Sequence, residues 1–385
     1  MAVLSLFVSL LSLSTLIAAF PKPLNTRDNG SATDASSTPR LIMYVQTFHD
    51  ENDSNDLSLL PLLDDNTGVT HVILAMLHLN TSPGDIHLNN DPPNSTSFDS
   101  AWSDVKTLQS NGIKVMGCLG GAGDGSYGHL ADDFDSYYQP LLNNVIKPYA
   151  LDGLDLDIES STNISVPLQL INALYNDMGP DFLITLTPVA SALQSPSGGD
   201  LSVFSYFDLD SQAVVSGTTT KLVSWYNAQF YSGFGDPSSP SDYESIINAG
   251  WDPSRVVMGV LDSANDGSGE VAVGTLESTI ESLHSEYSTF GGVYGWEYFD
   301  AGSSDGDANP WQWVQQIGNA LFNNTSSKML RTRAPATFPP APFPSKDLEL
   351  LEASGATHFE AVRALNLTSG DVDAAANVYH AYQSR

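Results

Sequence analysis

Short runs of apolar residues, each closed by Gly, Pro, Asn, Asp or Ser, recur along most of the chain. Runs of this kind, rich in β-branched and aromatic residues, indicate buried strands. They predict eight strands, at residues 41–48, 70–77, 113–121, 151–159, 182–189, 221–231, 255–261 and 291–299. Between them, apolar residues recur at helical spacing, and several of these segments end in Gly, a helix stop signal. The clearest predicted helices are residues 100–112, 166–179, 241–250, 276–287 and 309–322.

Strands that alternate with helices in this way predict a (β/α)8 TIM barrel, an α/β fold in which eight parallel strands close inside a ring of helices. A doubly wound open sheet is the structural alternative, but no Gly-rich phosphate loop follows the first strand. We therefore expect residues 40–322 to form one barrel domain, of the kind that carries catalytic sites.

The two ends of the chain differ from this pattern. Residues 4–19 form an apolar run, so we expect a secretory signal peptide over residues 1–19, with an uncleaved membrane anchor as the alternative. Residues 20–39 are polar and are expected to be disordered, and residues 323–345 are rich in Pro, Ser and Thr, which predicts a flexible linker. Residues 346–385 return to helical spacing and resemble a UBA-like three-helix domain, most closely over residues 370–375.

Composition narrows the possible partners. The chain has 45 acidic and 14 basic residues and a formal net charge of −31, which excludes nucleic acid and anionic membranes as electrostatic partners. Sequons at Asn29, Asn52, Asn80, Asn94, Asn163, Asn323, Asn324 and Asn366 favour a secreted, extracellular glycoprotein. Cys118 is the only cysteine, so a large core rather than an internal disulfide must stabilise the fold. We expect a monomer with no cofactor, no metal and no membrane contact after signal cleavage.

The fourth predicted strand carries an unusual row of acids in the sequence LDGLDLDIES, residues 151–160. Alternate side chains of a strand share a face, so Asp155, Asp157 and Glu159 point one way, and the intervening apolar residues point the other. In a barrel the acids line the interior, with Glu159 nearest the carboxyl-terminal mouth where barrel enzymes react. Asp152 has the opposite parity.

Three shielded carboxylates on one face cannot all ionise at low cost, so at least one is expected to hold a proton at neutral pH. A protonated Glu at the mouth is a general acid. A Ca²⁺ site is an alternative, although Ca²⁺ ligands usually lie on a flexible loop rather than on an apolar strand. A solvated edge strand is a second alternative, which the regular apolar residues opposite the acids disfavour.

The spacing Asp152-x-x-Asp155-x-Asp157-x-Glu159 matches the DxxDxDxE signature of glycoside hydrolase family 18, which the chain resembles over most of residues 40–322. The family's SxGG motif appears as Cys118-Leu119-Gly120-Gly121, with Cys in place of Ser. The resemblance implies a retaining, substrate-assisted mechanism with Glu159 as acid and base. It also implies that Asp157 orients the substrate's acetamido group, that Asp155 shares a proton with Asp157, and that Gly120 and Gly121 let substrate approach.

Two further strands carry candidate substrate contacts. Trp225, Asn227, Gln229 and Tyr231 share one face of residues 221–231. The resemblance implies that Tyr231 donates a hydrogen bond to the acetamido oxygen, and that Trp296 lies beneath the sugar that is cleaved; packing at the barrel mouth is the alternative for both. Asn227 and Gln229 are further substrate-binding candidates. Tyr44, Gln46 and His78 are weaker candidates, because a lone polar residue at a strand end is often structural.

The family resemblance suggests three activities. Segments such as PRLIMYVQTFHD and GGVYGWEYF are similar to fungal endo-β-N-acetylglucosaminidases, which cleave the GlcNAc-β-1,4-GlcNAc core of high-mannose N-glycans. We therefore predict an endoglycosidase whose partner is an N-glycan or another GlcNAc-containing oligosaccharide. A chitinase is the alternative, disfavoured because the chain has no separate chitin-binding pattern. A non-catalytic glycan-binding protein is a third, which the full set of acids opposes.

Overall fold

The computed structural model describes residues 38–49, 56–122, 125–197 and 201–326, together with Val372. The predicted signal peptide, nearly all of the predicted N-terminal disordered stretch, most of the predicted linker and the UBA-like segment apart from Val372 lie outside the described residues. Within the described part of the chain, no helix is both long enough and apolar enough to cross a membrane.

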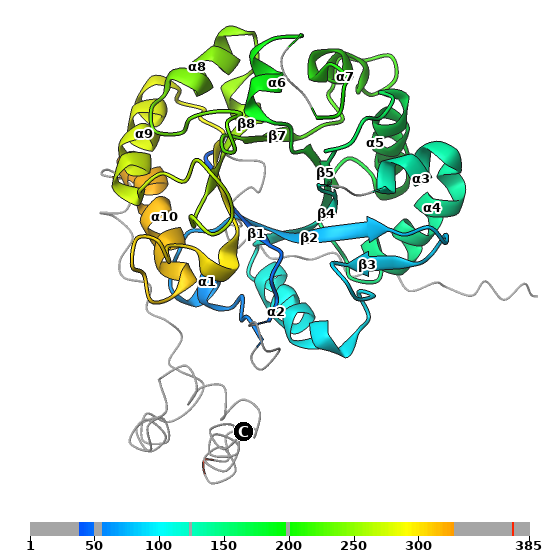
Figure 1. Ribbon diagram of the computed structural model, residues 1–385, viewed down its shortest axis with the longest axis horizontal. Coiled ribbons are helices and arrows are strands. Elements are labelled where there is room, and N and C mark those ends of the chain that lie inside the picture. Colours follow the sequence, from blue (N-terminus) through cyan, green and yellow to red (C-terminus); the bar gives the residue numbers. More distant parts are fainter. Residues whose placement is uncertain (1–37, 50–55, 123–124, 198–200, 327–371, 373–385) are drawn as a thin grey trace, which may run out of the picture.

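Eight parallel strands close into the predicted barrel, with helices around them (Figure 1). They are β1 (Arg40–Val45), β2 (His71–Leu79), β4 (Lys114–Gly120), β5 (Gly153–Asp157), β6 (Leu183–Leu186), β7 (Trp225–Gln229), β8 (Val256–Leu261) and β9 (Gly292–Trp296). The parallel pairings of β1 with both β2 and β9 close the barrel. The short β3 (Ile86–Leu88) adds to β2 as an antiparallel strand at the barrel rim.

The helices follow the strands in the order expected of this fold. The longer ones are α2 (Asp99–Ser110), α5 (Ser165–Met178), α8 (Ser241–Asn248), α9 (Val273–Glu286) and α10 (Pro310–Ser326), close to the five predicted helices. Shorter helices, which the sequence pattern did not predict, are α1 (Pro61–Asp64), α3 (Ser126–Asp132), α4 (Phe134–Pro140), α6 (Ala190–Gln194) and α7 (Tyr206–Gln212). A π-helical turn (Leu141–Ile146) follows α4, and 3₁₀ turns cover Thr96–Phe98, Pro253–Arg255 and Tyr298–Asp300. Since α10 ends at Ser326, the helix continues past the domain boundary predicted at residue 322.

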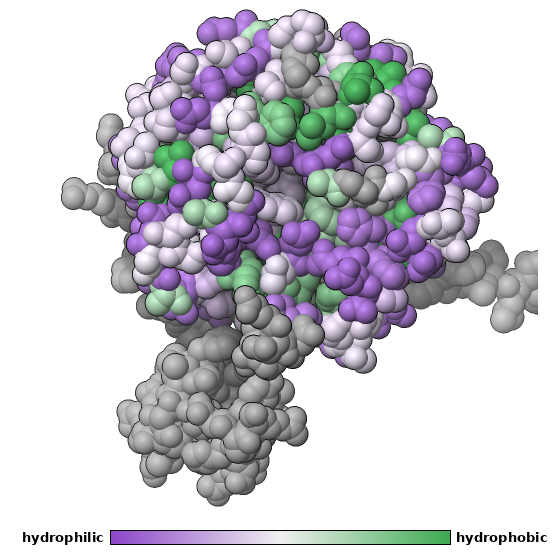
Figure 2. Space-filling model, viewed as in Figure 1, coloured by the Kyte–Doolittle hydropathy of each residue, from purple (hydrophilic) through white to green (hydrophobic). Residues whose placement is uncertain are grey.

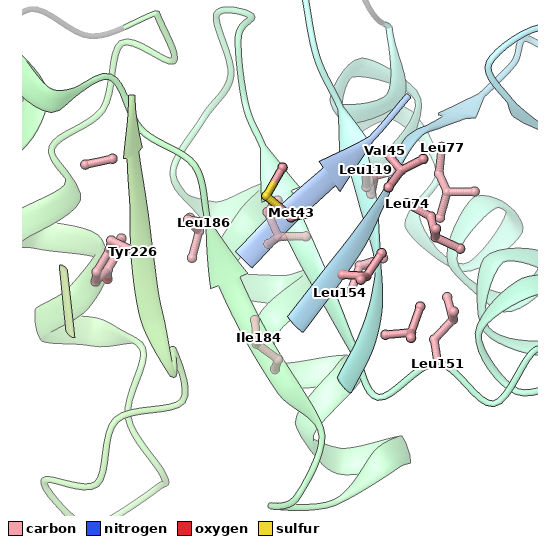
Figure 3. Close-up of a cluster of buried hydrophobic side chains, with 14 of the residues drawn as sticks. Met43, Val45, Leu74, Leu77, Leu119, Leu151, Leu154, Ile184, Leu186 and Tyr226 are labelled. Atoms are coloured by element: carbon pink, nitrogen blue, oxygen red, sulfur yellow. The ribbon is translucent and has the colours of Figure 1, made fainter. Parts of the chain in front are cut away.

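Two apolar clusters correspond to the two faces of the strands. The larger cluster lies between the strands and the helices, and Figure 3 shows part of it, including Leu154 of β5 and Leu186 of β6. The smaller cluster fills the barrel interior and includes Tyr44, Cys118 and Trp225. Burying one face of each strand under helices and the other inside the barrel excludes water from both, which explains the continuous apolar runs in the sequence.

Candidate active site

The acidic face of β5 points into the barrel, as its two-residue period predicts. Leu154 and Leu156 belong to the outer cluster under the helices, and Asp155 and Asp157 lie on the opposite face. The strand ends at Asp157, so Glu159 lies two residues beyond it, at the carboxyl-terminal mouth. The predicted strand is therefore correct in its faces and slightly too long at both ends.

Asp152 has the opposite parity and lies away from this site. Lys114 Nζ donates to its Oδ1 at 2.8 Å, and the Val115 amide and Gln109 Nε2 donate to its Oδ2 at 2.9 and 3.0 Å. The ion pair is partly exposed, so it contributes little stability by itself. The first acid of the sequence motif thus joins α2, β4 and the start of β5 and has no contact with the other three.

Asp155 is fully buried and is surrounded by hydrogen-bond donors. Its donors are the hydroxyl groups of Tyr44 (2.8 Å), Thr185 (2.5 Å) and Thr187 (2.5 Å), the amide of Asn227 (3.1 Å) and the thiol of Cys118 (3.3 Å). Because every one of these groups can donate, the arrangement fits a carboxylate that accepts at both oxygens. Asp155 is therefore held rigidly and has no free oxygen to attack a substrate.

Asp157 has fewer partners than Asp155. Its side chain is 7% exposed, and Gln229 Nε2 lies 3.4 Å from its Oδ1. Burial, followed by the nearby Glu159 and Asp155 carboxyl groups, raises the pKa of Asp157 well above its ordinary value. This direction is consistent with the expectation that one acid of the row keeps a proton at neutral pH.

Glu159 is half-buried and shares a single amide with Asp157. Gln229 Nε2 lies 3.1 Å from Glu159 Oε1 and 3.1 Å from the carbonyl oxygen of Thr187. Gln229 itself is buried at the end of β7, so its amide holds a fixed position between the two acids. The amide of Gln229 therefore links Asp157 to Glu159, and the proton sharing expected between Asp155 and Asp157 stays a prediction.

A cavity of about 460 Å³ opens at this mouth. Figure 2 shows a hollow near the middle of the face seen down the barrel, with hydrophilic residues along much of its rim. Of the predicted site residues, the cavity is lined by Glu159, Asp157, Tyr231, Trp296, Gln229, Gly120, Gly121 and Tyr44. The weaker candidates Gln46 and His78 also line it. A pocket with converging acids, an amide and aromatic rings is the usual form of a small-molecule site.

The aromatic wall of the cavity comes from three strands. Trp296, at the end of β9, packs against Tyr44 of β1 with ring centroids 5.6 Å apart. Tyr231, just after β7, has its Oη 3.1 Å from Tyr294 Oη. Burial raises the pKa of Tyr231 well above its ordinary value, so its hydroxyl group keeps its proton and can donate to a ligand.

Asn227 is the one predicted substrate contact that lies below the cavity. Its Nδ2 donates to Asp155 and, at 3.0 Å, to Tyr44 Oη, and its Oδ1 accepts from Trp225 Nε1 at 2.9 Å. The side chain is fully buried and supports Asp155. Thr185 and Thr187, which the sequence analysis did not single out, also donate to Asp155, and Thr187 in addition lines the cavity. Their alternation in the predicted strand 182–189 was the available signal.

The two glycines of the predicted motif allow close packing of β4 against β5. Gly120 has a φ of +115°, and a Cβ at this position would lie 2.0 Å from the carbonyl oxygen of Asp157. Gly121 has a φ of +94°, and a Cβ there would lie 2.9 Å from Met76 Cε. The absence of side chains at these positions keeps Asp157 close to β4 and leaves the cavity floor open.

A second hollow of about 530 Å³ adjoins the first. It shares Gln46 and His78 with the cavity described above and extends along residues 47–49 and 88–91 to Phe98. Asn89 fixes this region, because its Nδ2 donates to the Gln46 carbonyl at 2.6 Å and its Oδ1 accepts from the Met76 amide at 3.0 Å. The site is therefore a cavity over the acids with a polar extension on the β1 and β2 side.

Two curated chitinases are similar in sequence to this chain. Chitinase 2 of Rhizopus oligosporus is 26% identical over 284 residues, which are 69% of this chain and 50% of that protein. Chitinase 1 of Rhizopus niveus is 29% identical over 267 residues, 62% of this chain and 50% of that protein. The chain thus spans about half the length of the curated relatives it matches.

Solved structures cover the barrel more fully. A fungal endo-beta-N-acetylglucosaminidase from glycosyl hydrolase family 18 is 40% identical, with a TM-score of 0.67, over 74% of this chain and 99% of that one. Chitinase ChiC from Aspergillus fumigatus is 43% identical, with a TM-score of 0.65, over 73% of this chain and 98% of that one. Residues 40–324 match the family model described as glycosyl hydrolases family 18. The chain belongs to glycosyl hydrolase family 18.

Proposed function

We propose that the protein is a retaining glycoside hydrolase that cleaves the β-1,4 bond following a GlcNAc residue, without a carboxylate nucleophile of its own. The observation that supports this most is the division of roles within the acidic row. Asp155 is enclosed by five donors, whereas Glu159 and Asp157 line the cavity. An enzyme with a carboxylate nucleophile needs two accessible acids on opposite sides of the bond. Here Glu159 and Asp157 both come from the end of β5, and the third acid that lines the cavity, Asp266, accepts a hydrogen bond from the backbone amide of Glu297 in the wall beside Trp296.

In the proposed mechanism, Glu159 donates a proton to the glycosidic oxygen as the bond to the anomeric carbon breaks. The carbonyl oxygen of the substrate's 2-acetamido group attacks that carbon and forms an oxazolinium intermediate. Asp157 accepts a hydrogen bond from the acetamido N–H through a carboxyl oxygen, and the amide Nε2 of Gln229 lies 3.4 Å from Asp157 Oδ1 and 3.1 Å from Glu159 Oε1. Glu159 then removes a proton from water as the water oxygen attacks the anomeric carbon. The bond between that carbon and the acetamido oxygen breaks, which restores the acetamido group and gives overall retention.

The cavity walls fit a GlcNAc ring. Trp296 presents a flat indole, which suits the apolar C–H face of a sugar at small entropic cost. Tyr231 supplies a hydroxyl group that can donate to the acetamido oxygen. The proposed substrate contacts thus combine one apolar surface with a few placed polar groups.

For the substrate, we propose the chitobiose core of N-glycans, which makes the protein an endo-β-N-acetylglucosaminidase. The polar hollow beside the cavity offers room for a branched, hydroxyl-rich glycan. The likeness to a fungal endo-beta-N-acetylglucosaminidase over almost the whole of that chain is consistent with this choice. A chitinase that hydrolyses β-1,4-linked GlcNAc polymers is the second candidate, because the likeness to chitinase ChiC is of similar strength.

The purified full-length chain, incubated in parallel with a high-mannose glycoprotein and with chitin oligomers, tests the proposal. We expect release of the glycan with one GlcNAc left on the protein, detected by mass spectrometry. Cleavage of chitin oligomers alone would transfer the assignment to chitinase, and cleavage of neither would favour a glycan-binding protein. The Glu159→Gln variant, assayed in the same way, shows whether any cleavage originates at this site.

A further inference from the structure

A second group of acids lies beside the cavity, formed by Asp262, Asp266 and Asp300. Asp262 follows β8 directly, Asp266 lies in the loop after it, and Asp300 ends the 3₁₀ turn after β9. One carboxylate oxygen from each of the three lies within 4.8 Å of the others. The pairing of β8 with β9 brings these two loops together.

Asp262 is the most unusual member of the group. Its side chain is 1% exposed, and neither carboxylate oxygen has a hydrogen-bond partner among the described residues. Asp300 uses only one oxygen, Oδ2, which accepts from Ser263 Oγ at 2.9 Å and Asn265 Nδ2 at 2.7 Å. Its Oδ1 is buried and has no partner within the same described part of the chain. Buried carboxylate oxygens without donors are costly, so this arrangement calls for a ligand.

The charges in the group point to a positive ligand. Three carboxylates whose oxygens all lie within 4.8 Å of one another repel one another when they are ionised. A cation placed between them would relieve both this repulsion and the lack of donors to the buried oxygens of Asp262 and Asp300.

We propose that Asp262, Asp266 and Asp300 bind a hard divalent cation, with Ca²⁺ as the preferred ion. An all-oxygen set of carboxylates suits Ca²⁺ or Mg²⁺ and disfavours the softer transition metals. Two oxygens bound to one Ca²⁺ lie at most about 5 Å apart, since each Ca–O distance is about 2.4 Å. The carboxylate oxygens all lie within 4.8 Å of one another, which is inside this limit. Three protein carboxylates suit Ca²⁺ better than Mg²⁺, which usually binds one or two carboxylates and keeps several waters.

The cation would join the loops after β8 and β9 at the cavity wall. Asp266 Oδ2 accepts from the backbone amide of Glu297 at 3.3 Å, and Glu297 directly follows Trp296. The Glu297 carboxylate in turn accepts from the Gln46 and Thr47 amides at 2.6 and 2.8 Å. Since Asp266 and Trp296 both line the cavity, a cation here would fix the position of the indole. This role is structural and does not depend on the proposed substrate.

Thermal unfolding of the full-length chain tests the proposal. The protein is stripped with a chelator at pH 7 and titrated with Ca²⁺ alone and with Mg²⁺ alone. At about 100 times the Kd, we expect Ca²⁺ to raise Tm by roughly 5 °C, with a smaller response to Mg²⁺. A larger response to Mg²⁺ would overturn the choice of ion, and no response to either would overturn the site and indicate that shared protons neutralise the acids.

Two variants and a control assign the effect to these residues. Asp262→Asn keeps the side-chain volume and is expected to abolish the Ca²⁺-dependent rise in Tm, and Asp300→Asn is expected to do the same. Asp305→Asn removes one exposed charge from the same loop and should retain the full response. Tb³⁺ luminescence provides a second readout for any variant that folds poorly. An unchanged Ca²⁺ response in both Asp262→Asn and Asp300→Asn would refute the proposal.

Discussion

The barrel has two groups of acids, the row on β5 that contains Asp155 and the loop cluster that contains Asp262. Aspartate side chains of the two groups lie in opposite surroundings. Asp155 is fully buried among five hydroxyl, amide and thiol donors. Asp262 is as deeply buried, but its carboxylate has no donor among the described residues. The comparison teaches that burial alone does not define the chemistry of a carboxyl group. The donors around it decide whether the group is a fixed carboxylate or a candidate for binding a proton or a cation.

The largest expected effect is on catalysis and comes from Glu159, the accessible end of the acidic row on β5. Glu159→Gln keeps the side-chain volume and removes the transferable proton, so we expect kcat to fall by about 10³-fold with Tm nearly unchanged. Steady-state kinetics on the cleaved glycan and a thermal melt measure the two quantities. A variant with near-normal kcat would show that another group supplies the proton.

Matched substitutions at the two buried acids should have opposite effects on stability. Asp155→Asn places an amide donor among groups that already donate, so we expect a loss of about 1–3 kcal/mol in the free energy of unfolding. Asp262→Asn removes a charge that lacks donors, so in chelator we expect a change near zero or a gain of about 1 kcal/mol. Urea unfolding of both variants measures the difference. Equal losses at the two positions would contradict the contrast drawn between them.

The raised pKa of Asp157 predicts how the free energy of unfolding depends on pH. Its pKa in the folded protein is raised above the unfolded value, so the folded state keeps this proton while the unfolded state releases it. Stability from this group is therefore present below about pH 4 and is lost as the pH rises toward the raised pKa, by at most about 1.4 kcal/mol per pH unit.

Asp157→Asn should remove this dependence, so its stability relative to wild type should increase as the pH rises from 4. Urea unfolding at a series of pH values measures the slope. The exposed Asp132→Asn is the control and should follow wild type. Parallel curves for wild type and Asp157→Asn would indicate that Asp157 ionises normally.

The smallest expected effect is on stability and comes from removing one of the five hydrogen-bond donors to Asp155. Tyr44→Phe deletes the hydroxyl group that donates to Asp155 at 2.8 Å and leaves the ring packed against Trp296. We expect a loss of about 1 kcal/mol in the free energy of unfolding, since the other four donors remain. Chemical denaturation detects a change of this size. A loss as large as that of Asp155→Asn would mean that the contact from Asn227 Nδ2 to the Tyr44 hydroxyl group contributes as much as the contact to Asp155.

Sequence patterns predicted most of the first acidic group because it lies on strands. The two-residue period separated Asp155, Asp157 and Glu159 from the apolar residues between them, and it placed Asn227 and Gln229 on an inward face. The period does not predict which residues of other strands face these side chains inside the barrel. Which donors reach Asp155 depends on strand register and on barrel closure, which no local pattern encodes.

The second acidic group could not be predicted in this way. Asp262, Asp266 and Asp300 lie in loops that have no periodicity, and Asp300 is brought to the others only by the pairing of β8 with β9. The short helices α6 and α7 were missed for a related reason, since elements of so few turns carry too little apolar repeat to distinguish them from loops. The longer helices and the strands could thus be predicted from the sequence, whereas contacts between loops could not.

The burial of Cys118 gives the protein a built-in reporter of its own unfolding. The thiol is the only one in the sequence, is inaccessible inside the barrel and donates to Asp155, and its burial raises the pKa of the thiol well above its ordinary value. An alkylating reagent can therefore reach it as a reactive thiolate only when the barrel opens. The rate of alkylation, followed by mass spectrometry on the unmodified sequence, would time that opening without an introduced label.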